Sequence, residues 1–118
     1  YTLAAKQGQV NAQLSLGVMY QNGIGIPQHF KTAIKWYRLA AEQGNTFAQT
    51  NLGVMYKNGW GVEQDNVYAH MWFNLAASQG DKNAAESRDK LAKKMIPTNI
   101  SKTQDLAREC VQKKYKGC

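Results

Sequence analysis

The chain has 118 residues, of which 43% are hydrophobic and 19% are charged, so it holds enough apolar material for one compact core or a short array. No apolar run approaches the roughly 18 residues needed to span a bilayer, and no basic-then-apolar signal segment is visible, so we expect no membrane span. The formal net charge of +7 is spread along the chain, with local clusters at residues 90–94 and 113–116, which we interpret as a solvated surface.

An internal repeat organises the sequence. The motif Ala-Ala-x-Gln-Gly at residues 4–8 returns at 40–44 and at 76–80, 36 residues later each time. Aligned without gaps, residues 9–44 match residues 45–80 at 18 of 36 positions, which chance does not produce. We therefore divide the chain into residues 1–8 as the end of a truncated repeat, 9–44 as repeat 1, 45–80 as repeat 2, and 81–118 as a degenerate C-terminal capping repeat.

Each repeat is predicted to begin with a helix, at about residues 10–21 and 46–57, because its small and apolar residues recur at helical spacing. Gly17 and Gly53 lie inside these helices, where glycine costs about 1 kcal/mol relative to alanine. A glycine kept at this position predicts the close approach of a neighbouring helix. The Asn-Gly-x-Gly segment that follows predicts the end of the helix.

A second helix is predicted at about residues 30–43 and 66–79. Asp65 is well placed as the N-cap of the second copy, whereas His29 holds the same place in the first copy and is a weaker cap. Tyr1 falls in the register of this helix, so we expect the chain to open partway through such a helix, with further repeats before it. The expected buried stripe alternates small and aromatic residues: Ala33, Trp36, Tyr37, Ala40 and Ala41, then Ala69, Trp72, Phe73, Ala76 and Ala77.

The third unit departs from this pattern. Residues 82–95 are predicted to form its first helix, but the glycine turn is missing and Pro97 breaks the chain instead. A last helix is predicted from about Pro97 or Ser101 to about Lys113, and Ser101 with Gln104 fits a capping box. Terminal repeats are expected to be atypical because they close the apolar end of the stack.

The histidines and the glycine turns are not predicted to form sites. No cysteine or histidine stands at metal-ligand spacing beside His29 or His70; we expect His29 in the loop before a helix and His70 on a helix surface. The Gly-x-Gly turns follow a helix and lack a third glycine, so they are not dinucleotide-binding loops. We therefore expect no metal and no cofactor.

Trp60 stands apart from the other tryptophans. It replaces Ile24 in the turn, whereas Trp36 and Trp72 occupy the repeated buried position. Two interpretations stay open. Either Trp60 packs on the adjacent repeat, or it is an exposed anchor for a partner, since tryptophan is enriched at binding hot spots.

The pattern Ala…Leu-Gly-x-Met-Tyr-x-x-Gly-x-Gly-Val…Asp…Ala…Trp…Ala-Ala-x-x-Gly resembles the Sel-one-like repeat, a relative of the tetratricopeptide repeat. The departures are local: His29 stands where Asp is usual, and the third unit lacks the glycines. The resemblance implies an all-α fold, a right-handed α/α superhelix (solenoid) of helix–turn–helix repeats whose first helices line a concave surface. It also implies scaffold or adaptor work with a protein or peptide partner, often in bacterial host interaction or envelope processes.

The stripe of the first helices that does not face the core would then face the partner. Its positions recur at three- and four-residue steps, so they share one face. The apolar residues Leu14, Phe47 and Val54 suit a groove for a peptide; alternatively they cover the neighbouring first helix. The stripe consists of Asn11, Leu14, Val18 and Gln21 in repeat 1, Phe47, Thr50, Val54 and Lys57 in repeat 2, and Asn83, Glu86, Lys90 and Lys93 in the third unit.

Cys110 and Cys118 are eight residues apart. On a continuous helix that separation is roughly 12 Å, more than the about 7 Å that a disulfide allows, so a bond needs a turn, which Lys116-Gly117 can supply. The resemblance implies a disulfide, because secreted cysteine-rich members of the family carry cysteine pairs at this spacing, and with it a periplasmic or secreted location. Two unpaired thiols are the alternative.

Three functions remain in view. The favoured one is a protein-interaction scaffold, acting as a monomer and not as an enzyme. The second is an enzyme acting on β-lactam or cell-wall substrates, as described for some cysteine-rich relatives: residues 87–90 fit Ser-x-x-Lys, but Ser-Asp-Asn and Lys-Thr-Gly are absent. The third is a basic nucleic-acid binder; because most aromatic residues are expected to be buried, we expect no nucleic-acid partner.

Overall fold

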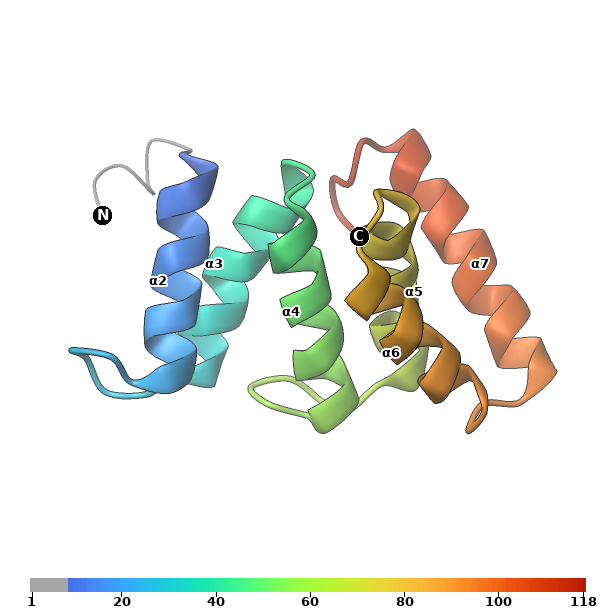
Figure 1. The fold of residues 1–118 in the computed structure, drawn as a ribbon, viewed down its shortest axis with the longest axis horizontal. Helices are drawn as coiled ribbons and strands as arrows, with labels where there is room; N and C mark the ends of the chain where they lie inside the picture. Colours follow the sequence, from blue (N-terminus) through green and yellow to red (C-terminus); the bar gives the residue numbers. More distant parts are fainter. Residues whose placement is uncertain (1–8) are drawn as a thin grey trace.

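The computed structural model describes residues 9–118, and these residues form α-helices and no strand, as predicted (Figure 1). The helix end expected at residues 1–8 lies outside the described residues. None of the helices within 9–118 is long and apolar enough to cross a membrane. The helices are α2 (Val10–Asn22), α3 (Phe30–Glu42), α4 (Thr46–Asn58), α5 (Asn66–Ser78), α6 (Lys82–Ala92) and α7 (Pro97–Gln112).

The helices form an elongated array of antiparallel pairs. We call α2, α4 and α6 the A helices and α3, α5 and α7 the B helices. Figure 1 shows the A helices side by side in chain order, with α3 and α5 behind them and α7 at the C-terminal end of the array. The described part measures 42 × 27 × 23 Å, and α3 contacts α4 as well as α2, so that each repeat packs on the next.

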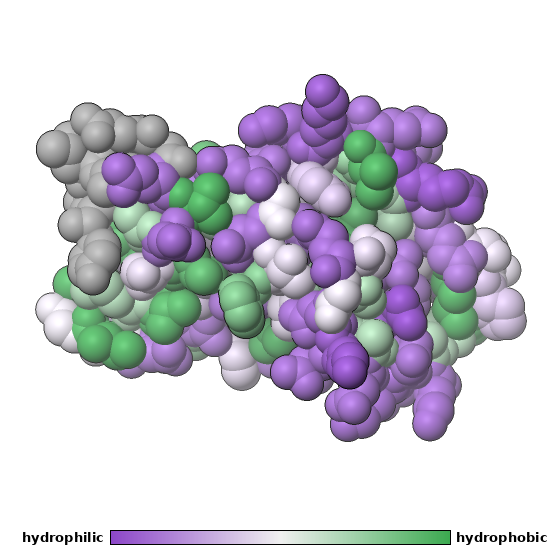
Figure 2. Space-filling view, turned by 45° about the horizontal axis from the view of Figure 1, so that its top comes forward, coloured by the Kyte–Doolittle hydropathy of each residue, from purple (hydrophilic) through white to green (hydrophobic). Residues whose placement is uncertain are grey.

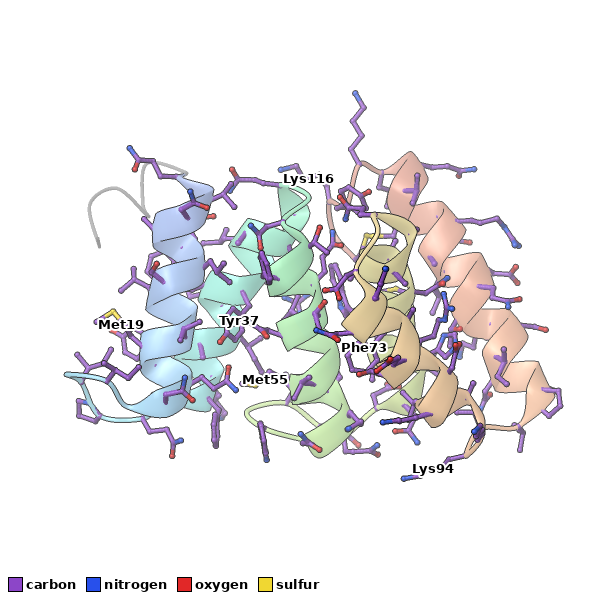
Figure 3. The ribbon with its side chains drawn as sticks, in the orientation of Figure 1. Met19, Tyr37, Met55, Phe73, Lys94 and Lys116 are labelled. Atoms are coloured by element: carbon purple, nitrogen blue, oxygen red, sulfur yellow. A yellow bond between two sulfur atoms is a disulfide. The ribbon has the colours of Figure 1, made fainter. Side chains whose placement is uncertain are left out.

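The glycines inside the A helices allow the two helices of a repeat to pack closely, as predicted. A Cβ atom on Gly17 would lie 2.5 Å from the ring of Tyr37, and one on Gly53 would lie 2.6 Å from the ring of Phe73 (Figure 3). Any side chain at these positions would therefore overlap an aromatic ring that is itself fully buried.

The B helices carry the repeated core that the sequence predicts. The predicted stripe of α3 is buried in full, and that of α5 is buried except for Ala77, which is half-buried. The caps also follow the prediction. Asp65 accepts hydrogen bonds from the backbone N–H groups of Val67 and Tyr68, whereas the Nδ1 atom of His29 accepts one, from Thr32.

A hydrogen bond between two glutamines, one buried and one exposed, joins the two helices of each repeat and was not predicted from the sequence. The side-chain amide of Gln43 donates to Gln13 at 2.8 Å, and Gln79 donates to Gln49 at 2.7 Å. The four residues are identical across the repeats, and that identity was the available signal. Because a buried amide needs a partner, these bonds fix how each A helix sits on its B helix.

The start of α7 corrects one prediction. Helix α7 begins at Pro97, so the capping box at Ser101 was wrong: Ser101 lies inside the helix and is exposed. Ile96 is the N-cap, with extended backbone at ψ 148°. A residue before proline disfavours helical angles, and proline suits the first position of a helix. The pair Ile96-Pro97 therefore both prevents a continuous helix and starts α7. Helix α6 ends at Ala92, three residues earlier than predicted.

His70 was predicted on a helix surface, and this was wrong. Its side chain is only 3% exposed, and its Nδ1 atom lies 2.6 Å from the hydroxyl oxygen of Thr103, which is also fully buried. The reason is that α7 packs against α5 and covers this face. The aligned residue Ile34 is buried as well, so the position belongs to the core in both repeats.

Cys110 and Cys118 form the disulfide that the family resemblance implied, with 5.7 Å between their Cα atoms. The turn that allows it includes the predicted Gly117, with φ at 69°, and also Lys114 and Tyr115, whose φ angles are 55° and 68°. The ring of Tyr115 packs on the hydrophobic core and lies within 3.6 Å of where a Cβ atom on Gly44 would be. The disulfide thus closes a tail that covers the junction of the two repeats.

Candidate functional site

The predicted partner-facing stripe is partly covered in repeat 1. Leu14 and Val18 are half-buried and pack against the core, and the side chain of Gln21 accepts a hydrogen bond from the hydroxyl of Tyr37. Of the predicted stripe residues on α2, only Asn11 is exposed.

The stripe on α4 and α6 is more accessible. Phe47 is 69% exposed, the most exposed large hydrophobic residue among residues 9–118. Thr50 donates a hydrogen bond to the carboxylate of Asp81 at 2.8 Å, which ties α4 to the N-cap of α6, and Val54 is half-buried. The remaining stripe residues are all exposed: Lys57, Asn83, Glu86, Lys90 and Lys93.

Two cavities lie between α4 and α6, one at each end of these helices, and we call the surface from one to the other the groove between α4 and α6. We call the one at the N-terminal ends of the helices the Phe47 cavity. Its volume is about 540 Å³, and it is lined by Thr46, Phe47, Thr50, Asn51, Gln79, Gly80, Asp81, Lys82 and Asn83.

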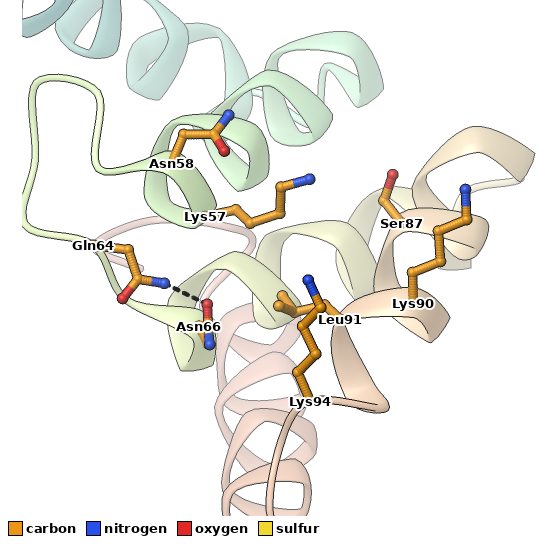
Figure 4. Close-up of a pocket in the computed structure, with 8 residues that line it drawn as sticks. All are labelled: Lys57, Asn58, Gln64, Asn66, Ser87, Lys90, Leu91 and Lys94. Carbon is orange, nitrogen blue, oxygen red and sulfur yellow. Dashed lines mark hydrogen bonds between the residues drawn. The ribbon is translucent and has the colours of Figure 1, made fainter.

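We call the cavity at the C-terminal ends of the same helices the lysine pocket (Figure 4). Its volume is about 460 Å³. Five stripe positions therefore line these two cavities: Phe47, Thr50 and Asn83 line the Phe47 cavity, and Lys57 and Lys90 line the lysine pocket. The lysine pocket is lined by Lys57, Asn58, Gln64, Asn66, Ser87, Lys90, Leu91 and Lys94.

The lysine pocket is built from three segments that the chain brings together. Lys57 and Asn58 end α4, Gln64 lies in the turn before α5, and Asn66 is the first residue of α5. The other residues come from α6 and the turn after it. The side chain of Gln64 donates to Asn66. Sequence analysis found Lys57 and Lys90 but did not assign Lys94 to a site; its spacing of four residues from Lys90 was the signal.

Ser87 and Lys90 of the Ser-x-x-Lys pattern both line the lysine pocket. Within residues 9–118 the hydroxyl of Ser87 makes no hydrogen bond, and no histidine or carboxylate lines the pocket. An activated serine needs a base within hydrogen-bond reach, and Ser87 has no such partner among residues 9–118. In the same residues, no cluster of His, Cys, Asp or Glu is arranged to hold a metal ion.

Trp60 packs on the adjacent repeat and is also partly accessible. Its ring stacks on that of Phe30, with 5.6 Å between ring centroids and 12° between planes, and 39% of the residue is exposed. The stacking agrees with the first interpretation, and a role of Trp60 as an anchor for a partner stays a prediction.

Another open cavity, of about 530 Å³, lies between the B helices α5 and α7, with Leu75, Ala107 and Val111 among its lining residues. Sequence analysis did not single out this surface. Figure 2 shows hydrophobic side chains gathered toward the end of the array that holds α2, and hydrophilic side chains over α6 and α7. Helix α2 contains no charged residue.

Comparisons with known proteins agree with the fold. The Sel1 repeat family model matches residues 10–45 and 46–81. A protective antigen present in uropathogenic Escherichia coli strains, which displays an SLR fold, is 32% identical, with a TM-score of 0.89 over 95% of this chain and 25% of that one. A Sel1 repeat protein from Oxalobacter formigenes is 36% identical, with a TM-score of 0.70 over 72% of this chain and 35% of that one.

This chain therefore spans a quarter to about a third of the length of those two proteins. No curated protein matches it. The all-α solenoid of helical repeats expected from the sequence is confirmed.

Proposed function

The chain belongs to the Sel1 repeat family, and from this premise we propose that it is a protein-interaction scaffold that binds a protein or peptide partner on the surface of its A helices. The partner-facing residues are those of the predicted stripe, above all the ones along α4 and α6. Trp60, in the turn between α4 and α5, is a further contact in this proposal.

The observation that carries the proposal is the groove between α4 and α6. Phe47 stands 69% exposed at one end of it, and five stripe positions line its two cavities. An exposed aromatic residue beside polar groups that can pair with a peptide backbone is typical of a peptide-binding groove.

We also propose that the chain acts without catalysis and in an oxidising compartment, periplasmic or extracellular. The Cys110–Cys118 disulfide supports the second point, since disulfides persist in such compartments. Nitrocefin hydrolysis that disappears on Ser87→Ala would overturn the first point.

The experiment tests whether binding depends on the A helices. A random peptide library is selected on the protein, and the affinity of a selected peptide is then measured for the variant Phe47→Ala/Lys57→Ala. We expect affinity to fall about tenfold or more, with the thermal midpoint shifting by less than about 3 °C, because both side chains are exposed.

The matched control removes one exposed apolar residue and one exposed lysine from α7, as Val111→Ala/Lys102→Ala. We expect the control to bind like the original protein. If only the control loses affinity, the partner lies in the cavity between α5 and α7, and the A-helix proposal is wrong. A large fall in the melting temperature of Phe47→Ala/Lys57→Ala would show these residues to be core and would also overturn it.

A further inference from the structure

The lysine pocket has an unbalanced charge. Lys57, Lys90 and Lys94 line it, and no acidic residue does. Within residues 9–118 none of these three lysines forms an ion pair. Asp89, which precedes Lys90, is paired with Arg88, and Asp65, between Gln64 and Asn66, is occupied as the N-cap of α5. Figure 4 shows Lys57 and Lys94 extending from different segments into the same space.

Like charges gathered around one concave space repel each other, and an anion placed among them relieves that repulsion. The other lining groups suit a carboxylate as well. The amides of Asn58 and Gln64 and the hydroxyl of Ser87 can each donate a hydrogen bond to an oxygen atom. The site therefore matches a compact, oxygen-rich anion and not an apolar side chain.

We propose that the groove between α4 and α6 binds a short, extended, acidic peptide segment, with its carboxylates in the lysine pocket and an apolar side chain on Phe47. This inference rests on the proposed function and adds the chemical class of the partner. It also fixes a spacing within the partner.

The spacing follows from the geometry of α4. Phe47 and Lys57 are ten residues apart on one helix, which is about 15 Å at about 1.5 Å per residue. An extended peptide advances about 3.3 Å per residue. The apolar residue and the acidic residues of the partner thus lie four or five residues apart.

The distribution of charge favours a peptide over a nucleic acid. Double-stranded DNA carries about one charge per 1.7 Å, and proteins that bind nucleic acids typically have a long basic surface or exposed aromatic rings that stack on bases. Here α2 has no charged residue, so no such track continues along the A helices. The exposed aromatic ring of Trp60 is already stacked on Phe30.

The test compares labelled peptides by fluorescence anisotropy. The acidic probe carries two adjacent aspartates and a leucine about five residues away; the neutral probe has asparagines in place of the aspartates. We expect the acidic probe to bind more tightly, with affinity falling as salt is added. Equal binding of the two probes would overturn the proposal, as would tighter binding of a single-stranded oligothymidine than of the acidic probe.

A charge-matched pair of variants locates the effect. Lys57→Gln/Lys90→Gln/Lys94→Gln empties the pocket of charge, and Lys35→Gln/Lys102→Gln/Lys116→Gln removes the same charge from exposed sites that do not line the groove. Lys94 and Lys116 lie at opposite edges of the molecule (Figure 3). We expect about a tenfold or larger loss for the first set and less than about threefold for the second.

Equal losses for the two sets would overturn the proposal, because the effect would then be one of net charge. A lower melting temperature of the pocket variant with unchanged peptide affinity would overturn it too, since the lysines would only be complementing the C-terminal ends of the helices. If the neutral probe binds as well as the acidic one and loses affinity on Phe47→Ala, this inference fails while the proposed function stands. If no selected peptide depends on the A helices, the proposed function itself fails.

Discussion

At the scale of single residues, the repeat is held together by close helix contacts that only glycine permits. Gly17 and Gly53 each pack directly against an aromatic ring of the other helix of their repeat. The gain is dense packing around Tyr37 and Phe73, which are both fully buried. The cost is the low helix propensity of glycine.

Gly53→Ala tests this balance. Alanine should gain about 1 kcal/mol of helix propensity, yet its Cβ would lie 2.6 Å from the ring of Phe73. We expect the overlap to dominate and the free energy of unfolding to fall by about 2 kcal/mol, measured by urea denaturation. In a Phe73→Leu background the same substitution should cost much less; equal losses in both backgrounds would contradict the contact.

At the scale of helices, the attachment of α7 to α5 depends on a buried histidine. Burial lowers the pKa of His70, and the positive charge of Arg88 lowers it further, while Asp89 acts in the opposite direction. The neutral ring bonds to the hydroxyl of Thr103 on α7. A proton on His70 therefore opposes the packing of these two helices.

This predicts a pH dependence of stability. Because the pKa of His70 is lower in the folded chain than the about 6.5 of an unfolded one, the unfolded chain takes up the proton first. The free energy of unfolding should thus be constant above about pH 7.5 and fall as the pH drops below about 6.5. His70→Ile, which copies Ile34 of repeat 1, should flatten this part of the curve; an unchanged slope would contradict the assignment.

A second helix-scale prediction concerns the disulfide. The bond closes a loop of eight residues, and for a loop of that size the chain-entropy model gives about 2.5 kcal/mol. Reduction should lower the free energy of unfolding by about that amount, and the tail that carries Tyr115 should lose its packing near Gly44. Cys110→Ala/Cys118→Ala is the control, because its unfolding should not respond to a reductant. An original protein that responds no more than this control would contradict the prediction.

The repeat explains why so much of this fold could be predicted from the sequence. Two aligned copies of one unit show which positions stay apolar, small or glycine. The helices of repeats 1 and 2, their glycine turns and the Asp65 cap could therefore be predicted. The prediction failed at the start of α7, which has no second copy, and at His70, where the aligned Ile34 was the available signal. Thr103 lies on α7, which has no regular counterpart, so nothing in the sequence paired it with His70.

The candidate site was only partly predictable for a related reason. The periodicity of one helix identifies its exposed face, and it found Phe47, Lys57 and Lys90. It does not tell which faces of α4 and α6 come together, so Lys94, Gln64 and Asn66 were missed. Conversely, Leu14 and Val18 share the periodic stripe but are half-covered by the core, which depends on how α3 packs.

At the scale of the whole molecule, the stacking of one repeat on the next sets the shape of the array. The turn between α4 and α5 reaches back to repeat 1, where Trp60 stacks on Phe30. Beside it, a Cβ atom on Gly61 would lie 2.7 Å from the backbone of Phe30. In a repeat protein such contacts between neighbours are the terms that make unfolding cooperative across units.

The equivalent glycine of repeat 1 offers a matched comparison for this contact. Gly25 and Gly61 hold the same place in their turns and have similar φ angles, 72° and 77°. A Cβ atom on Gly25 would meet no described atom within 4 Å, whereas one on Gly61 would meet the backbone of the neighbouring repeat. Alanine at either site pays the same left-handed strain, of about 1 kcal/mol.

Gly61→Ala should therefore lower the free energy of unfolding by at least about 1 kcal/mol more than Gly25→Ala. The reason is that a Cβ atom on Gly61 would overlap the backbone of Phe30 in the neighbouring repeat, and a backbone cannot move aside as a flexible side chain can. Urea denaturation of both variants measures the difference, and near-ultraviolet circular dichroism should report the loss of the stacked Trp60 ring for Gly61→Ala alone. If the two variants lose equal stability, only the strain of the turn matters, and the repeats are held together by their helices without the turn.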